Sequence, residues 1–165
     1  YPDFPKKGVN FLDIFSATAK PEIMKVLLEG CHELIEDKIG TDFTHVVGVE
    51  SKGFVLGPLL AMHYGKPFVP IRKKGKLPGE CHQQEYTLEY GSDIVEIQKA
   101  ALPPGSKVLL VDDLMATGGT MNAAEALIDR LDECSVAANL CIFEIKFFNG
   151  AAKLQKPFLS LIDLE

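Results

Sequence analysis

Short apolar segments of strand type alternate along this chain with longer segments of helix type. The strand-type segments are residues 46–49, 68–71, 107–111 and 136–145, and the helix-type segments are residues 21–35, 54–64 and 121–131. Repeated alternation of this kind favours βαβ units, in which parallel strands form one sheet and helices cover its faces. The sequence therefore predicts an α/β fold with a mostly parallel central sheet flanked by helices.

A further pair of segments has the pattern of a β-hairpin. Residues 86–90 alternate between apolar and polar side chains, and an extended segment at residues 94–97 follows the turn signal Gly91-Ser92. The chain shows no repeat, linker or low-complexity segment. With 165 residues and 47% hydrophobic content it can bury one core of useful size. We expect a single domain over residues 1–165.

The charge balance and the cysteines limit the kinds of partner. A formal net charge of −6 argues against binding nucleic acid through its phosphates, because such proteins usually carry a basic excess. The four cysteines lack C-x-x-C spacing, which indicates reduced thiols and no metal site. No segment has the ~20 consecutive apolar residues that span a bilayer, and residues 1–10 lack the apolar run of a signal peptide. We expect a soluble, cytoplasmic protein that contacts neither nucleic acid nor membrane.

Residues 108–120 carry the strongest chemical signal. A buried strand-type run leads into Asp112 and Asp113, then into a small turn with Gly118 and Gly119, and then into a helix. Glycine lets a backbone approach a ligand closely, so amide N–H groups and threonine hydroxyls can surround a phosphate at a helix N-terminus. No lysine follows the glycines, so the turn suits one terminal phosphate and not a triphosphate.

The two carboxylates suit a sugar next to that phosphate. The loops beyond the carboxyl ends of parallel strands gather at one edge of a sheet, so residues 50–53 and residues 112–120 should meet there. Asp112 and Asp113 could then accept hydrogen bonds from sugar hydroxyls and stabilise positive charge on a ribose ring. The alternative interpretation is a plain turn in which the aspartate pair caps a helix.

A basic run lies between two predicted extended segments. Glycine at position 75 and the sequence Leu-Pro-Gly at residues 77–79 predict a flexible loop. Taken alone, the run is a solvated surface segment, but a phosphate-binding turn elsewhere in the chain supplies an anion for it to close over. The basic residues are Arg72, Lys73, Lys74 and Lys76.

These motifs, in this order, resemble those of the type I phosphoribosyltransferases, and in particular the adenine phosphoribosyltransferases. The resemblance covers nearly the whole chain. The matching segments are residues 4–14 (a base-covering hood), 47–54 (a pyrophosphate loop), 72–79 (a mobile catalytic loop), 88–91, 96–99, and 116–120 with the aspartate pair (the signature for phosphoribosyl pyrophosphate, PRPP).

The resemblance implies the type I phosphoribosyltransferase fold, with a small N-terminal hood at residues 1–15 and a mobile catalytic loop and hairpin at residues 72–91. It implies transfer of the phosphoribosyl group from PRPP to adenine, giving AMP and pyrophosphate, by a homodimer. Mg²⁺ is the implied cofactor. It would bind through PRPP and pyrophosphate, because Mg²⁺ commonly bridges substrate oxygens and keeps several waters.

The same resemblance implies roles for individual residues. Glu89 would orient the base or accept its N7 proton, although a solvated strand residue is the alternative for Glu89. The implied sites are Ala116, Thr117, Gly118, Gly119 and Thr120 for the 5′-phosphate; Ser51, Lys52, Lys73 and Lys76 for pyrophosphate; Asn10, Phe11 and Leu12 for adenine; and Glu89, Asp112 and Asp113 for catalysis.

Two positions depart from the family pattern. Leu12 stands where an arginine usually follows the hood phenylalanine, and Lys52 replaces an arginine of the pyrophosphate loop. Lysine keeps the charge but gives up the bidentate fork, whereas leucine removes the charge. Two alternative functions stay open: a phosphoribosyltransferase for another 6-substituted purine, and a catalytically weak PRPP- or AMP-binding protein on the same fold.

Overall fold

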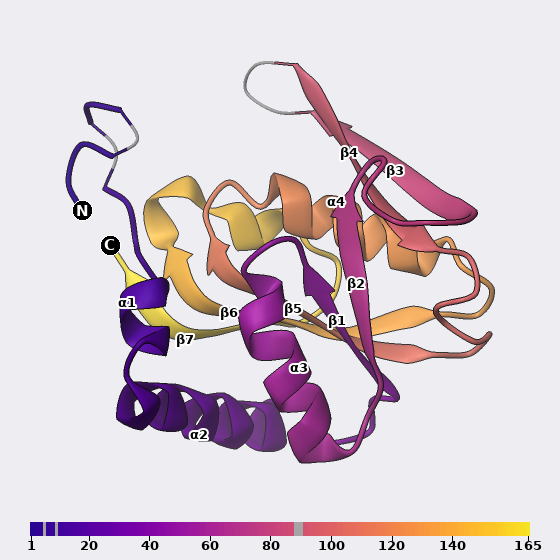
Figure 1. Ribbon diagram of the computed structural model, residues 1–165, viewed down its shortest axis with the longest axis horizontal. Coiled ribbons are helices and arrows are strands. Elements are labelled where there is room, and N and C mark those ends of the chain that lie inside the picture. Colours follow the sequence, from indigo (N-terminus) through magenta and orange to yellow (C-terminus); the bar gives the residue numbers. More distant parts are fainter. Residues whose placement is uncertain (5, 9, 88–90) are drawn as a thin grey trace.

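The computed structural model describes residues 1–4, 6–8, 10–87 and 91–165, and these residues form a mixed sheet of seven strands with helices on both faces (Figure 1). The strands are β1 (His45–Val49), β2 (Phe68–Lys73), β3 (Cys81–Thr87), β4 (Ser92–Gln98), β5 (Lys107–Met115), β6 (Ser135–Ile145) and β7 (Phe158–Leu164). The helices are α1 (Phe15–Thr18), α2 (Pro21–Lys38), α3 (Gly53–Tyr64) and α4 (Gly119–Asp129), with short 3-10 helices η1 (Lys146–Phe148) and η2 (Gly150–Lys153).

The strand order brings the carboxyl ends of β1, β2 and β5 to one edge of the sheet. The order is β3-β4-β2-β1-β5-β6-β7. β2, β1, β5, β6 and β7 run parallel, and the hairpin β3–β4 joins them antiparallel, through β4 and β2. In Figure 1 the hairpin rises away from the parallel strands, and α4 contacts it. The predicted α/β class with a mostly parallel sheet is confirmed.

Helices cover both faces of the parallel strands. α2 and α3 pack on one face, over a buried cluster that includes Ile35, Leu60 and Leu109. α4 packs on the other face, over a cluster that includes Leu110 and Leu127. β1 and β5 are therefore buried on both sides, which explains why their sequences are almost continuously apolar. This core anchors the two strands from which the candidate site extends.

The three predicted helices are confirmed, with small shifts at their ends. α2 has Pro21 in its first turn, where a proline costs nothing because that N–H has no helical partner. α4 begins at Gly119, two residues before the predicted start, because Gly118 forms its N-cap. The turn and the helix are thus continuous.

The strand predicted at residues 107–111 is longer than the sequence pattern indicates, so the predicted end at residue 111 is wrong. β5 continues to Met115 because its extension pairs with β6, with Asp112 opposite Cys141 and Leu114 opposite Phe143. Asp112 and Asp113 consequently lie inside a strand and not in a loop. Neighbouring side chains of a strand point to opposite faces, so the two carboxylates have different surroundings.

The basic segment and the hairpin also differ from the prediction. Arg72 and Lys73 belong to β2, and β3 begins at Cys81, earlier than the alternating pattern from residue 86 indicates. Residues 88–90 of the predicted hairpin strand lie outside the described residues. β7 and α1 have no counterpart among the predicted elements, because the former has mixed polarity and the latter is a single helical turn.

Candidate active site

The turn between β5 and α4 has the geometry of a phosphate cradle. Gly118 has a φ of 76°, a left-handed conformation that glycine adopts without strain. Its neighbour in space is Gly150, whose carbonyl oxygen would lie 2.4 Å from a Cβ atom on Gly118. Together with Asp112, residues 114–121 line a cavity of about 110 Å³ at the N-terminus of α4, where the helix dipole and free amide groups favour an anion. We call this cavity the phosphate cavity, and the five predicted phosphate-binding residues all line it.

Gly119 is under less constraint than Gly118. It is the first residue of α4, and its φ lies outside the left-handed region. The atom nearest to a Cβ on Gly119 would be Cδ2 of Tyr86 at 3.7 Å, which is an ordinary contact. Packing within the protein therefore demands glycine at position 118, whereas a demand at position 119 would come from a bound ligand.

The aspartate pair divides between two environments. Asp112 lines the phosphate cavity, and its carboxylate accepts the backbone N–H of Asp113 at 2.9 Å. Burial, followed by the charge of Asp113, raises the pKa of Asp112 well above its ordinary value. Asp113 is buried and instead accepts a 2.7 Å hydrogen bond from the Lys52 ammonium. Asp112 thus lines the phosphate cavity, whereas Asp113 forms an ion pair with Lys52.

Lys52 connects the turn after β1 to the hood segment. The turn starts with a cis peptide bond between Glu50 and Ser51, and Ser51 is exposed. Gly53 packs so closely on β5 that a Cβ there would lie 2.4 Å from the carbonyl oxygen of Val111. With the turn held in this way, the Lys52 ammonium lies over Phe11, 5.2 Å from the ring centroid. The turn, β5 and the hood segment therefore meet at this lysine.

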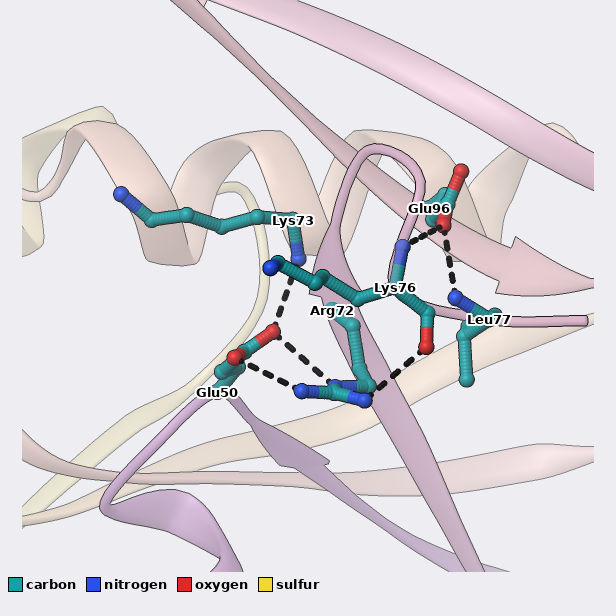
Figure 2. A network of polar contacts seen from close by, with 6 residues as sticks. All are labelled: Glu50, Arg72, Lys73, Lys76, Leu77 and Glu96. Carbon is teal, nitrogen blue, oxygen red and sulfur yellow. Dashed lines mark hydrogen bonds and ion pairs between the residues drawn. The ribbon is translucent and has the colours of Figure 1, made fainter.

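Two carboxylates hold the basic segment in place (Figure 2). The Glu50 carboxylate accepts two hydrogen bonds from the Arg72 guanidinium, at 3.1 and 3.0 Å, and one from the backbone N–H of Lys73 at 3.1 Å. These hydrogen bonds, led by those from Arg72, lower the pKa of Glu50. Glu96 is buried and accepts the backbone N–H groups of Lys76 at 3.0 Å and Leu77 at 3.1 Å. No local pattern predicts Glu50 and Glu96 as site residues, because their partners are distant along the chain.

A second cavity, of about 240 Å³, borders this network, and we call it the anion cavity. It is bordered by the carboxyl ends of β1 and β2, the hairpin and the start of α4. Lys73 lines it, with its ammonium 2.9 Å from Asp93. In Figure 2 the Lys73 side chain extends away from Glu50 and Arg72. The lining residues are Val49, Glu50, Ile71, Arg72, Lys73, Tyr86, Asp93, Val95, Asp112 and Thr120.

A third and larger cavity, the hood cavity, has a volume of about 580 Å³. The three predicted adenine-binding residues all line it, although they come from a segment distant from β5 and β6. Phe147 and Phe148 also line it, and no sequence pattern had indicated a role for this aromatic pair. The lining residues are Gly8, Asn10, Phe11, Leu12, Lys52, Leu114, Ala116, Ile145, Phe147, Phe148, Leu164 and Glu165. Glu89, the predicted base-orienting residue, lies outside the described residues.

Among the described residues, no group of three or more His, Cys, Asp or Glu side chains could hold a metal ion. The four cysteines all fall in the described part of the chain and are unpaired. No described helix combines the length and the apolar character needed to cross a membrane.

The fold and the phosphate cradle define a phosphoribosyltransferase, and residues 18–148 match the family model described as a phosphoribosyl transferase domain. The chain is 40% identical to adenine phosphoribosyltransferase 1 of Saccharomyces cerevisiae, over 100% of this chain and 88% of the yeast protein. It therefore belongs to the adenine phosphoribosyltransferase family.

Two solved structures of this family resemble the chain closely. One is the crystal structure of the S. cerevisiae enzyme complexed with D-2,5-dideoxy-2,5-imino-altritol 1,6-bisphosphate and adenine. It has a TM-score of 0.93 and 41% identity, covering 98% of this chain and 92% of that one. The other is the Trypanosoma brucei enzyme in complex with AMP, pyrophosphate and ribose-5-phosphate, with a TM-score of 0.86 and 29% identity, covering 99% of this chain and 75% of that one.

Proposed function

We propose that this chain transfers the 5-phosphoribosyl group of PRPP to adenine, giving AMP and pyrophosphate in purine salvage. The continuity of the three cavities carries this proposal. Leu114 and Ala116 line both the hood cavity and the phosphate cavity, and Asp112 and Thr120 line both the phosphate cavity and the anion cavity. A base, a ribose phosphate and a pyrophosphate group can therefore occupy neighbouring positions along one path.

The roles of the side chains follow from the charge that develops during the reaction. The bond between C1 of the ribose and pyrophosphate breaks, the bond between C1 and N9 of adenine forms, and adenine gives up its N7 proton to Glu89 or to water. Positive charge on the ribose ring is stabilised by Asp112, while the turn from Ala116 to Thr120 holds the 5′-phosphate. Ser51, Lys52, Lys73 and Lys76 bind the pyrophosphate group in this proposal, and Glu89 orients the base. Asp113 acts by holding Lys52 in position.

Mg²⁺ fits this site as an ion carried by the substrate. Asp112 lines the anion cavity, and its carboxylate oxygens are the ligand type that Mg²⁺ prefers. Asp112 would contribute one oxygen ligand, directly or through water, and PRPP would supply most of the others. Bound there, Mg²⁺ would neutralise charge on the departing pyrophosphate.

A turnover assay with adenine, PRPP and Mg²⁺ tests the proposal, with release of pyrophosphate as the readout. AMP should form, and excess chelator should abolish its formation. Hypoxanthine and guanine should be poor substrates, because a site that pairs with the exocyclic amine of adenine leaves polar groups unpaired against a 6-oxo purine. Equal turnover of all three bases would contradict the choice of adenine.

Leu12 supports a second candidate function. It lines the hood cavity at the position where the family usually has an arginine. The alternatives to an efficient adenine enzyme are therefore a catalytically weak PRPP- or AMP-binding protein and a phosphoribosyltransferase for another 6-substituted purine. The assay separates these outcomes, because a protein that binds PRPP in calorimetry but forms no nucleotide from any base would be a binding protein. From the family resemblance we also propose a cytoplasmic homodimer, for which sedimentation of the purified chain is the direct test of assembly.

A further inference from the structure

Asp93 is a charged residue of the anion cavity to which the proposed function assigns no role. It lies in β4 opposite Tyr86 of β3, and its side chain is 25% exposed. Its carboxylate is 2.9 Å from the ammonium of Lys73, one of the residues proposed to bind pyrophosphate. In this structure, therefore, the charge of Lys73 already has a partner.

Asp93 also contacts the residues around it on the hairpin. It accepts the backbone N–H of Ile94 at 2.8 Å, and the Tyr86 hydroxyl lies 3.5 Å from its carboxylate. That hydroxyl is in turn 3.4 Å from Oγ1 of Thr120, in the phosphate turn. The contacts of Asp93, with the Lys73 hydrogen bond first among them, lower its pKa, so the carboxylate is charged at neutral pH. An anionic group thus stands between the basic segment and the phosphate cradle.

The charges of the anion cavity show what an incoming ligand must displace. The cations that line it are Arg72 and Lys73, and each is paired with a carboxylate, Glu50 and Asp93 respectively. The Arg72 pair has two hydrogen bonds from the guanidinium, whereas the Lys73 pair has one ammonium on a side chain that is 60% exposed. The Lys73 pair is therefore the easier one to exchange, because exposed single pairs contribute little free energy.

We infer that Asp93 is a positioning residue for the pyrophosphate group: it holds the Lys73 ammonium in the ligand-free protein and releases it to pyrophosphate on binding. The carboxylate competes with the pyrophosphate group for the same ammonium and also repels it. Asp93 therefore weakens the affinity for PRPP and favours release of pyrophosphate without contacting the reacting atoms. This inference rests on the proposed function.

The test is Asp93→Asn, which removes the charge and keeps the shape. Titration of Mg²⁺ and inorganic pyrophosphate into the whole chain, followed by calorimetry, should give a Kd about threefold tighter than that of the wild type, the effect expected of one partly exposed pair. KM for PRPP should fall by a similar factor, with kcat equal or lower. Asp129→Asn is the matched control. It removes the charge of another partly exposed lysine pair, between Lys156 and Asp129 at 3.6 Å, at the opposite end of α4 from Thr120, and should change neither constant.

A double-mutant cycle separates exchange of Lys73 from simple repulsion. In a Lys73→Gln background, Asp93→Asn should tighten pyrophosphate binding by much less than in the wild type. An equal effect in both backgrounds, or weaker binding by Asp93→Asn alone, would overturn the inference. Asp93→Ser replaces Asp93→Asn if the latter does not fold. A wild-type chain that neither binds pyrophosphate nor turns over would instead contradict the proposed function, so the two failures are distinguishable.

Discussion

The ammonium of Lys52 lies 2.7 Å from a carboxylate oxygen of Asp113, although the two residues are 61 positions apart in the sequence. The side chain of Lys52 is 22% exposed and that of Asp113 is 7% exposed. The pair joins the turn after β1 to β5, and the same ammonium lies over the ring of Phe11. A residue proposed to bind pyrophosphate is thus also part of the structural link between the sheet and the hood segment.

Lys52→Met should therefore destabilise the fold as well as weaken PRPP binding. It leaves the buried carboxylate of Asp113 without its partner, which should lower the free energy of unfolding by about 2 kcal/mol. Urea denaturation at neutral pH measures this loss. Lys52→Arg is the control, because it keeps the charge and should keep most of the stability. If Lys52→Met unfolds at the same urea concentration as the wild type, the ion pair has no structural role.

Asp112→Asn and Asp113→Asn should change stability in opposite directions, while both lower turnover roughly tenfold or more. The pKa of Asp112 is raised in the folded state, so its ionisation opposes folding above its ordinary pKa. Asparagine removes that charge and still accepts the N–H of Asp113, so the melting temperature should rise. Asp113→Asn loses the charge that pairs with Lys52, so its melting temperature should fall. If the melting temperatures of the two variants shift in the same direction, Asp112 and Asp113 do not have the different surroundings described above.

Gly118→Ala and Gly119→Val should separate the fold of the turn from its ligand binding. Alanine at position 118 must adopt a φ of 76° and meets the Gly150 carbonyl oxygen, so we expect a loss of about 2 kcal/mol or more. Valine at position 119 has room for its Cβ in the protein, so thermal melting should change little while calorimetry shows loss of PRPP binding. Normal PRPP affinity of the folded Gly119→Val variant would show that this backbone does not contact the phosphate.

The pair of Glu50 and Arg72 should contribute to stability at neutral pH and not in acid. Hydrogen bonds from Arg72 hold the pKa of Glu50 below its ordinary value of 4.5. The unfolded chain therefore binds this proton first as the pH falls, and the contribution is complete above the ordinary pKa and lost as the pH falls through the lower folded value. Urea denaturation of wild type and Glu50→Gln should give a difference that shrinks from pH 7 toward about pH 3. A difference that is constant with pH would mean that the charge of Glu50 is unimportant.

Leu12→Arg should raise kcat/KM for adenine by several-fold, or about 1 kcal/mol of transition-state stabilisation, the size expected of one charge-assisted hydrogen bond. Leu12 lines the hood cavity, whereas the phosphate cradle is formed by the turn before α4, so PRPP affinity should not change. Steady-state kinetics with adenine varied at saturating PRPP measures the effect. An unchanged or lower constant would indicate that this hood cavity holds the base without an arginine.

The order of most elements, and the phosphate turn, could be predicted because they depend on local patterns. Pro21 and the helical spacing after it define α2, the apolar runs define β1 and β5, and the glycines of the Thr-Gly-Gly-Thr turn permit its left-handed backbone at Gly118. Family motifs also located the hood residues, although Phe11 and Ala116 border one cavity only in the folded chain. Glu89 lies outside the described residues, so its role stays a prediction.

What the sequence determined by itself was the fold class, the turn and the residue types available to a phosphoribosyl substrate. Only the tertiary structure decided how those residues are paired. Pairing of β5 with β6 placed Asp112 and Asp113 in a strand, so one carboxylate faces the phosphate cavity and the other meets Lys52. The hydrogen bonds between Arg72 and Glu50 join residues 22 positions apart. Such pairs depend on strand register and on the approach of distant segments, which no local pattern encodes.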